Sequence, residues 1–425
     1  MSEVNLSRSI SVNYNYDVVV CGGGMAGCGA AIAAAREDAN VLLIERLEML
    51  GGLGSAGWVG NFCAAEGGLD GQGQVFDDIV QGLRSRGALG EENGWPLRRN
   101  ETYERVNCTF DHCYLPLVLQ DLALDADVDI LYASDVIGAE CSDQTIDSVL
   151  VHNRSLTQKV AGDVFIDATG DGVLSRHAGG HPLPDDPQHP GLIKPSNMIS
   201  MREADNPPDP PDDDVRCSDG VKPDYSVWPG AGDQVTLKMK LFHRDLDTST
   251  GRGYSDAVTA MRGEIPAFAD HFRSHHDESF VFAGSAPMLG LRESVRIEGD
   301  YVLTIADCRA GRRFDDAVAY GTFTVDANET SEILPPYQIP MRSLLVKDVE
   351  NCLVVGRCFS ADRLALSSAR TMATGCLMGQ AGGIAASLAS GPELRAVAAS
   401  DVRQRLIAYS DSNETMAEHL LGKGK

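Results

Sequence analysis

A glycine pattern, Gly22-x-Gly24-x-x-Gly27, constrains the fold more than any other feature of the 425-residue sequence. It follows a β-branched apolar run, 16–21, which is typical of a strand buried on both faces of a parallel sheet. It precedes an alanine-rich run, 28–36, whose small side chains predict a helix lying close to such a sheet. The chain is therefore expected to turn from strand to helix at these glycines.

A second apolar run, 41–44, ends at Glu45 and completes a predicted strand–helix–strand unit. In such a unit Gly22 allows the tight turn, Gly24 lets the backbone approach a pyrophosphate, and Gly27 lets helix and strand pack closely. The start of the helix offers free N–H groups to phosphates, and Glu45 is placed to accept hydrogen bonds from ribose hydroxyls. The pattern predicts a dinucleotide-binding site.

Apolar runs near both ends of the chain predict a nucleotide-binding domain that a second domain interrupts. Residues 164–166 and 352–355 have the composition of buried strands, and 372–390 predicts an apolar helix rich in small residues. We expect an α/β fold, in which a Rossmann-like domain with a parallel central sheet is interrupted by an α+β substrate domain.

The expected domain boundaries are 14–60, 111–180 and 336–425 for the nucleotide-binding domain, and 61–110 and 181–335 for the substrate domain. Within the substrate domain, Pro and Asp dominate residues 182–224. A stretch of this composition cannot form a packed core and predicts a surface loop or lid.

The balance of charge excludes several classes of partner. The chain has 36 Lys and Arg residues against 61 Asp and Glu residues, a formal net charge of −25, which repels nucleic acids and anionic membranes. No apolar run approaches a membrane span in length, and the first residues lack a basic and apolar leader. The eleven cysteines are scattered, as in a protein with reduced thiols. We therefore expect a cytoplasmic protein that binds neither nucleic acid nor membrane.

The pattern around Glu45 extends further, because Gly51 and Gly52 follow it after five residues. This arrangement resembles the fingerprint of the glutathione-reductase-type FAD-dependent oxidoreductases. Residues 167–172 (DATGDG) are similar to the ATG-type segment of that superfamily, and 356–360 with 368–383 are similar to its C-terminal flavin segment. More narrowly, 290–299 (GLRESVRIEG) and 337–342 (YQIPMR) resemble the broad FAD-dependent oxidoreductase family. The resemblance implies FAD as the cofactor.

The resemblance also implies roles for individual residues. Gly22, Gly24 and Gly27 would face the pyrophosphate and Glu45 the adenosine ribose. The start of the C-terminal helix would direct its positive end at the flavin carbonyl, where negative charge gathers on reduction. The other expected cofactor-binding residues are Gly51, Gly52 and Ser55 at the ribityl and flavin edge, Val136 at adenine, and Arg46, Gly170, Asp171, Gly356, Arg357, Thr374 and Gly375.

One residue departs from the pattern of many relatives, which carry an acidic residue where Arg357 stands. Asp171 or Asp362 could take over the role of that carboxylate. A pair of cysteines is also missing: the pyridine-nucleotide-disulfide class has Cys-x4-Cys soon after the Gly-Gly, and residues 53–60 contain no cysteine. Since only one G-x-G-x-x-G has the proper context, we expect no separate NAD(P)H domain.

One group of cysteines and one group of histidines could bind a metal, although a role without a metal is the favoured interpretation of both. Cys108 and Cys113 have the Cys-x4-Cys spacing, with Asp111 and His112 between them, and are interpreted as buried thiols in preference to a redox pair or a metal fragment. His271 and His275 share a helical face, but a zinc site needs further ligands. We expect no metal.

Substrate oxidation requires hydride delivery to the flavin and usually a base for the accompanying proton. If 292–297 is a strand, Arg292 and Arg296 share one face, while Glu293 lies on the apolar one and is a candidate base. A structural ion pair of Glu293 is the alternative. Arg292, Arg296 and Arg342 are candidates for holding a substrate carboxylate, with a surface or structural role as the alternative for each. His243, or one of His271, His275 and His276, is a further candidate base.

These patterns predict a two-domain flavoenzyme that dehydrogenates or oxidises a small organic substrate by hydride transfer and passes the electrons to oxygen or another acceptor. A flavin monooxygenase remains an alternative, since 171–176 faintly resembles the Asp-Gly motif of aromatic hydroxylases, although their Gly-Asp-Ala-x-His segment is absent. A flavin-binding protein without turnover is the third interpretation. Trp58, Phe62 and Cys63 either line the flavin or pack in the core.

Overall fold

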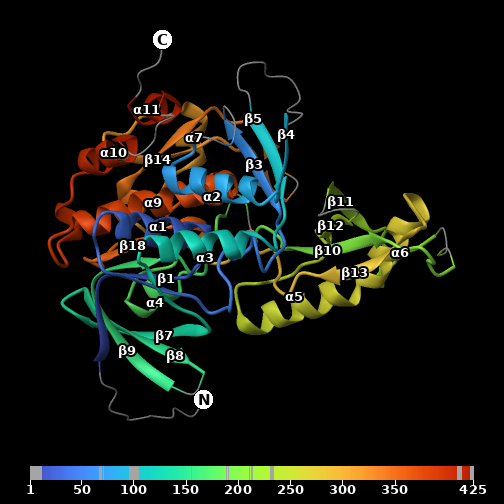
Figure 1. Ribbon diagram of the computed structural model, residues 1–425, viewed down its shortest axis with the longest axis horizontal. Coiled ribbons are helices and arrows are strands. Elements are labelled where there is room, and N and C mark those ends of the chain that lie inside the picture. Colours follow the sequence, from blue (N-terminus) through green and yellow to red (C-terminus); the bar gives the residue numbers. More distant parts are fainter. Residues whose placement is uncertain are drawn as a thin grey trace.

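The computed structural model describes residues 12–421, except 67–68, 70, 95–104, 155, 188, 190, 210, 212–213, 230–233, 329 and 409–413. Its main body is a parallel sheet with helices packed against it, and four antiparallel strands with two helices extend from it toward the right of Figure 1. The expected α/β class, with a Rossmann-like domain interrupted by an α+β unit, is confirmed.

The parallel sheet contains the predicted strand–helix–strand unit. Its strands are β6 (Asp129–Leu131), β2 (Val41–Ile44), β1 (Val12–Cys21), β9 (Leu156–Asp167) and β18 (Cys352–Val354), in that order, with β9 paired to both β1 and β18. Val18 to Val20 are buried on both sides, as the β-branched run predicts. The first half of β9 also joins an antiparallel extension formed by β8 (Thr145–Asn153) and β7 (Ser134–Ser142).

Two parallel helices lie side by side against this sheet (Figure 1). They are α1 (Met25–Arg36) and α9 (Met372–Leu388). A Cβ atom on Gly379 would come within 1.9 Å of the Ala26 carbonyl oxygen, and one on Gly383 within 2.1 Å of that of Ala30. Because the backbones approach so closely, only glycine fits at these positions, and the two helices begin at the same edge of the sheet.

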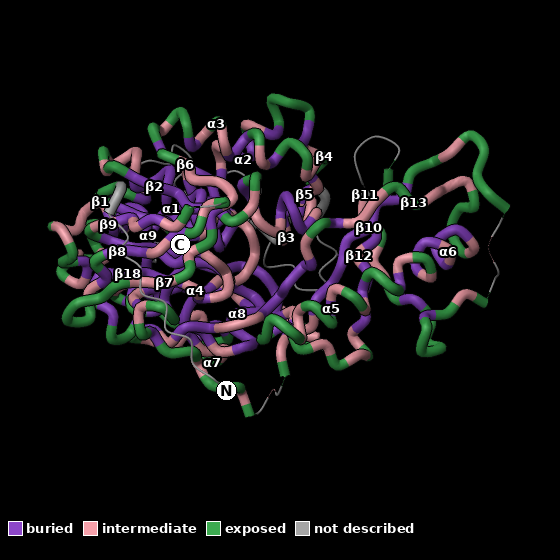
Figure 2. Tube along the Cα trace, turned by 90° about the horizontal axis from the view of Figure 1, so that it is seen from below, coloured by how far each residue is buried: buried purple, intermediate pink, exposed green. Residues whose placement is uncertain are grey.

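The antiparallel extension has its own core. Its sheet has the order β11 (Asp224–Pro229), β12 (Gln234–Lys240), β10 (Ser196–Glu203) and β13 (Phe280–Ser285), and α5 (Gly251–Gly263) and α6 (Ile265–His275) cover one face. Met201, Leu237 and Phe268 are fully buried between sheet and helices. Figure 2 shows buried residues filling the main body and continuing along β10 and β12.

Part of the expected loop at 182–224 is wrong, because β10 lies inside it and residues 196–201 are buried. The Pro and Asp residues mark only the segments that flank this strand, of which 188, 190, 210 and 212–213 lie outside the described residues. The packing also differs from the expected boundaries at 61–110: Phe62 stacks on Phe110 at a centroid distance of 4.3 Å, and both belong to the core of the main body.

The remaining elements complete the main body. They are β3 (Asn61–Glu66), α2 (Gln74–Ser85), β4 (Leu89–Gly94), β5 (Arg105–Phe110), α3 (Leu115–Asp125), α4 (Val173–His177), α7 (Ile305–Ala310), β14 (Ala317–Gly321), β15 (Val325–Ala327), β16 (Thr330–Glu332), β17 (Tyr337–Pro340), η1 (Met341–Ser343), η2 (Gly356–Cys358), α8 (Arg363–Ala369), η3 (Leu394–Ala396), α10 (Ala399–Ala408) and α11 (Glu414–Leu421). No helix within the described part of the chain is long and apolar enough to cross a membrane.

Candidate functional site: a cavity at two helix N-termini

A cavity that is open to solvent lies where α1 and α9 begin. Gly24, Met25 and Ala26 line it from α1, and Thr371, Met372 and Gly375 line it from α9. Neither helix start has a side-chain N-cap, so the N–H groups of both first turns are left for another acceptor. Two positive helix ends therefore face one space.

The glycine turn after β1 has the geometry that its pattern predicts. Gly22 has a φ of +103°, which disfavours any side chain, and a Cβ on Gly27 would lie 1.7 Å from the Gly22 carbonyl oxygen. A Cβ on Gly24, by contrast, would meet no atom within 4 Å. Gly27 is thus a packing residue that does not line the cavity, whereas Gly24 leaves room for a ligand against the helix start.

Glu45 ends β2 at the cavity wall and is only 5% exposed. One carboxylate oxygen accepts a hydrogen bond from the Gly23 N–H at 2.6 Å, and the other accepts one from the Leu47 N–H at 2.8 Å. Burial raises the pKa of Glu45 above its usual value, and these two N–H donors oppose the rise. The carboxylate is held in one position, with part of its acceptor capacity turned to the cavity.

The segment after β9 is organised by Asp167, which is completely buried. One of its oxygens accepts from the Thr169 hydroxyl at 2.7 Å, and the other accepts from both the N–H and the hydroxyl of Ser175 at 2.8 Å. Burial raises the pKa of Asp167, against the effect of these hydrogen bonds. Asp167 thereby fixes the turn that carries Gly170 and Asp171 into the cavity wall.

Arg357, the residue that departs from the pattern of many relatives, pairs with Asp171. Its guanidinium lies 2.9 Å from a carboxylate oxygen of Asp171, and the same oxygen accepts from the Ser294 hydroxyl at 2.6 Å. Although burial acts to raise the pKa of Asp171, Arg357 and Ser294 lower it below its usual value. Asp171 is therefore the acidic group that lies beside Arg357 in this wall. Asp362 instead caps the start of α8, with the Ala365 N–H at 2.8 Å.

Most of the expected cofactor-binding residues line this one cavity. The structure places there Gly22, Gly24, Glu45, Arg46, Gly51, Gly52, Val136, Gly170, Asp171, Gly356, Arg357 and Gly375. Ser55 and Thr374 do not line it: the Ser55 hydroxyl donates to the Leu50 carbonyl at 2.6 Å, and Thr374 accepts from the Thr371 hydroxyl at 3.1 Å.

Several lining residues were not anticipated from the sequence. They are Leu53 and Gly54, Ser134 and Asp135, and Met288, Leu289, Leu291 and Arg370. Ser134 and Asp135 directly precede Val136 on β7, so their place in the wall follows from that of Val136. Met288 to Leu291 come from the connection after β13, and only the three-dimensional fold brings them to the helix starts.

The four candidate catalytic side chains lie outside the cavity wall. His243 contacts Asp219 at 2.9 Å on the surface, and Arg342 pairs with Asp316 at 3.0 Å and is half-exposed. Arg292 is buried and pairs with Asp326 at 2.6 Å, directly after Leu291 of the wall.

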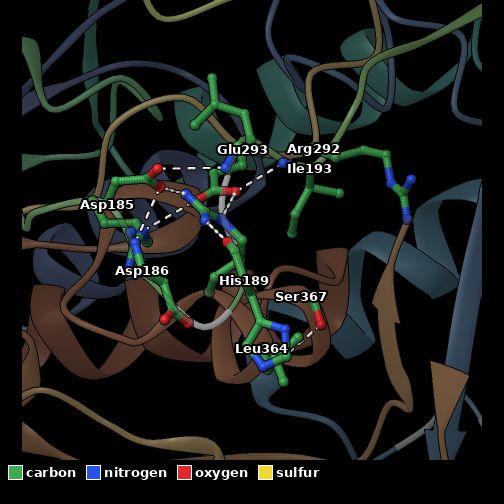
Figure 3. Close-up of polar contacts among 12 residues, drawn as sticks. Asp185, Asp186, His189, Ile193, Arg292, Glu293, Leu364 and Ser367 are labelled. Carbon is green, nitrogen blue, oxygen red and sulfur yellow. Dashed lines mark hydrogen bonds and ion pairs between the residues drawn. The ribbon is translucent and has the colours of Figure 1, made fainter. Parts of the chain in front are cut away.

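Glu293 is completely buried in a network of ion pairs. Its carboxylate lies 2.8 Å from the Arg363 Nε atom and 2.9 Å from that of Arg296, and it accepts from the Ile193 N–H at 2.9 Å. Figure 3 shows Glu293 and Arg292 extending in opposite directions, with Asp185 and His189 near Glu293. The structural ion pair is the arrangement found.

The expected face shared by Arg292 and Arg296 is wrong, because 292–297 is not a regular strand and forms only an isolated bridge at Ile297. Arg296 instead joins Glu293, three residues before it. Among the histidines, the rings of His271 and His275 stack at 4.0 Å, and no third ligand joins them among the described residues.

The other sequence groupings have separate positions. Cys108 is buried on β5, but Cys113 is exposed, so the interpretation as a buried thiol is wrong for Cys113; neither forms a disulfide. Possible ligand atoms of Asp111, His112 and Cys113 lie within 4.8 Å of one another, while the His112 ring lies 4.8 Å from the Trp58 ring and is tilted by 33° to it. Phe62 packs in the core, which is the second of its two interpretations, and does not line the cavity.

The comparisons with known proteins agree with this geometry. The family model described as FAD dependent oxidoreductase matches residues 17–406. No curated protein matches the chain. A solved structure of a geranylgeranyl bacteriochlorophyll reductase-like protein from Thermoplasma acidophilum is similar over 96% of this chain and 95% of that one, with 12% identity and a TM-score of 0.50.

Two further solved structures are similar at lower TM-scores. The anhydrotetracycline hydroxylase OxyS from Streptomyces rimosus has 13% identity over 95% of this chain and 66% of that one, with a TM-score of 0.48. A flavoprotein/dehydrogenase from Cytophaga hutchinsonii has 14% identity over 88% and 78%, with a TM-score of 0.47. At these identities the likeness concerns the fold alone.

Proposed function

The chain belongs to the FAD-dependent oxidoreductases, and we propose that it oxidises a small organic substrate by hydride transfer to FAD held in the cavity at the starts of α1 and α9. The observation that carries the proposal is the convergence of two uncapped helix N-termini on one cavity. FAD has two regions where negative charge is carried or gathers, the pyrophosphate and the flavin carbonyl, and two helix N-termini can stabilise both together.

The residues present fit the cofactor. The open space at Gly24 admits a pyrophosphate against the free N–H groups of α1, and Glu45 stands at the end of β2, where it can accept from ribose hydroxyls. Val136 lines the adenine end that the resemblance implies. Asp171, held by Arg357, supplies the acidic group beside the ribityl region.

The start of α9 marks the flavin end. Bound FAD supplies a two-electron acceptor for a hydride from a substrate carbon. The positive end of α9 at Thr371 to Gly375 favours negative charge at this place, which is the charge that reduction brings. Oxygen or another acceptor then takes up the electrons. The described part of the chain contains one parallel sheet with one glycine turn of this type.

Anaerobic mixing of the holoprotein with different reductants tests the proposal. We expect the flavin absorbance to persist with NADH or NADPH and to bleach with an oxidisable substrate. Rapid bleaching by a nicotinamide would contradict the proposal and favour the monooxygenase. Tight FAD binding without bleaching by any substrate or nicotinamide would favour a flavin-binding protein without turnover.

A further inference from the structure

Four charged side chains form a group behind the flavin end of the cavity: Lys238, Arg292, Asp326 and Arg370, called here the cationic cluster. Arg370 lines the cavity, and Arg292 follows Leu291, which also lines it. Lys238 projects from β12. The group combines three cations with a single carboxylate.

Asp326 is fully engaged by the two arginines. One carboxylate oxygen lies 2.6 Å from the Arg292 guanidinium, and the other lies 2.8 Å from that of Arg370. Both guanidiniums also donate to the Asp326 carbonyl oxygen, at 2.7 and 3.1 Å. Among the described residues, Lys238 has no carboxylate partner, and its ammonium lies 5.8 Å from the centre of the Trp228 ring.

Several donors of the cluster are buried without a partner. Arg292 is only 4% exposed, and neither its Nε atom nor its Nη1 atom makes a hydrogen bond. The Nε atom of Arg370 is likewise unpaired. Buried donors without a partner and a buried charge without a counter-charge both lower the stability of the fold. The excess of cations here, in a chain whose net charge is −25, therefore indicates that an anion binds to the group.

Lys238 and Arg292 keep their positive charge at neutral pH. Burial first, and then Arg292 and Arg370, lower the pKa of Lys238 to about 8, while Asp326 and Cys63 oppose the change. The pKa of Arg292 falls to about 10, mainly through burial. The pKa of Asp326 is lowered by the three cations to about 2, against the effect of burial. Three positive charges therefore face one negative charge.

We propose that the cationic cluster binds a carboxylate group of the substrate, so that the enzyme acts on small organic acids. Arg370 and Lys238 supply the charge for the carboxylate, and Arg292 is a positioning residue that holds Asp326 and, through it, Arg370. The inference rests on the proposed function, because it takes the substrate to lie beside the flavin end of the cavity.

Binding of simple carboxylates to the oxidised holoprotein tests this inference. Benzoate and acetate are titrated against the absorbance of bound flavin, with benzamide and acetamide as neutral analogues of the same shape. We expect a saturable change with the two carboxylates and none with the amides. Lys238→Met removes one cation without removing a hydrogen bond, and should weaken carboxylate binding by about tenfold or more.

Lys240 provides a matched control on the same strand. It pairs with Asp224 at 3.4 Å and lies outside the cluster, so Lys240→Met should leave carboxylate affinity unchanged. Lys238→Arg should retain binding, because it keeps the positive charge. Equal binding of amides and carboxylates, no response to either, or unchanged affinity in Lys238→Met would overturn the proposal.

These outcomes are independent of turnover, because the flavin stays oxidised throughout. If a nicotinamide bleaches the flavin while carboxylates bind as expected, the proposed function fails and the anion site stands. If Lys238→Met alters the flavin spectrum without changing carboxylate affinity, the cations serve the flavin instead, and the substrate proposal fails.

Discussion

Glu293→Gln should destabilise the protein without impairing its chemistry. The carboxylate is completely buried and faces two guanidiniums that are themselves almost inaccessible, with exposed fractions of 6% for Arg296 and 3% for Arg363. It also holds the Ile193 N–H. The side chain therefore connects segment 184–193 and the start of α8 to the main body and lies away from the cavity wall.

The contacts of Glu293 give the size of the effect. Removing one partner of a buried ion pair costs about 3–5 kcal/mol, because the remaining charge stays buried and unpaired. Glutamine keeps one oxygen as an acceptor, but its NH2 group replaces the other oxygen and faces an arginine donor. We therefore expect the free energy of unfolding to fall by about 3 kcal/mol. At about 2 °C per kcal/mol, the melting temperature falls by about 6 °C.

Thermal melting and limited proteolysis measure this effect, and Asp185→Asn is the matched control. Asp185 also pairs with Arg363, at 2.6 Å, but its side chain is 61% exposed, so the control should lose less than about 1 kcal/mol. In Glu293→Gln, cleavage within 184–193 should increase, while FAD affinity and the rate of flavin reduction stay within about twofold. An unchanged melting temperature combined with a reduction rate lowered by about a hundredfold would refute the structural role and restore Glu293 as a base.

Three further predictions concern the cofactor and anion sites. Gly24→Val should abolish FAD binding, measured by quenching of flavin fluorescence, and leave the melting temperature of the apoprotein nearly unchanged. Gly27→Ala should lower that melting temperature, because the Cβ atom of the alanine would lie 1.7 Å from the Gly22 carbonyl oxygen. Arg357→Leu should raise the pKa of Asp171, which is lowered in the native protein. On acidification the variant should therefore lose stability at a higher pH than the native protein. Melting temperatures that fall over the same acidic pH range in both proteins would contradict this. The affinity for benzoate should fall as pH rises above about 8, because Lys238 loses its charge there; a flat profile would count against its role.

The part of the cavity wall that follows from local sequence signals could be predicted from the sequence. The turn between β1 and α1 and the acidic residue after β2 depend on residues close in the chain, and Glu45 lines the cavity beside that turn. The C-terminal glycines near Gly375 follow from the same need for close backbone approach. Resemblance added the remote segment at Asp171, whose partner Arg357 is 186 residues away.

The catalytic candidates could not be placed by the same reasoning. Strand alternation assumes a regular strand, and the segment after Leu291 is irregular, so Arg292 and Arg296 reach different partners. The cationic cluster joins residues from four separate parts of the chain, Lys238, Arg292, Asp326 and Arg370, which no spacing rule connects. Likewise, β10 was hidden because the Pro and Asp residues around it dominate the composition.

Amide hydrogen exchange with and without FAD tests the central claim most directly, because it reports on both helix starts at once. The account predicts that the first turns of α1, at Met25 to Gly27, and of α9, at Met372 to Gly375, gain protection together when FAD binds. Protection at only one helix start, or at neither, would contradict the claim that one cofactor lies against both.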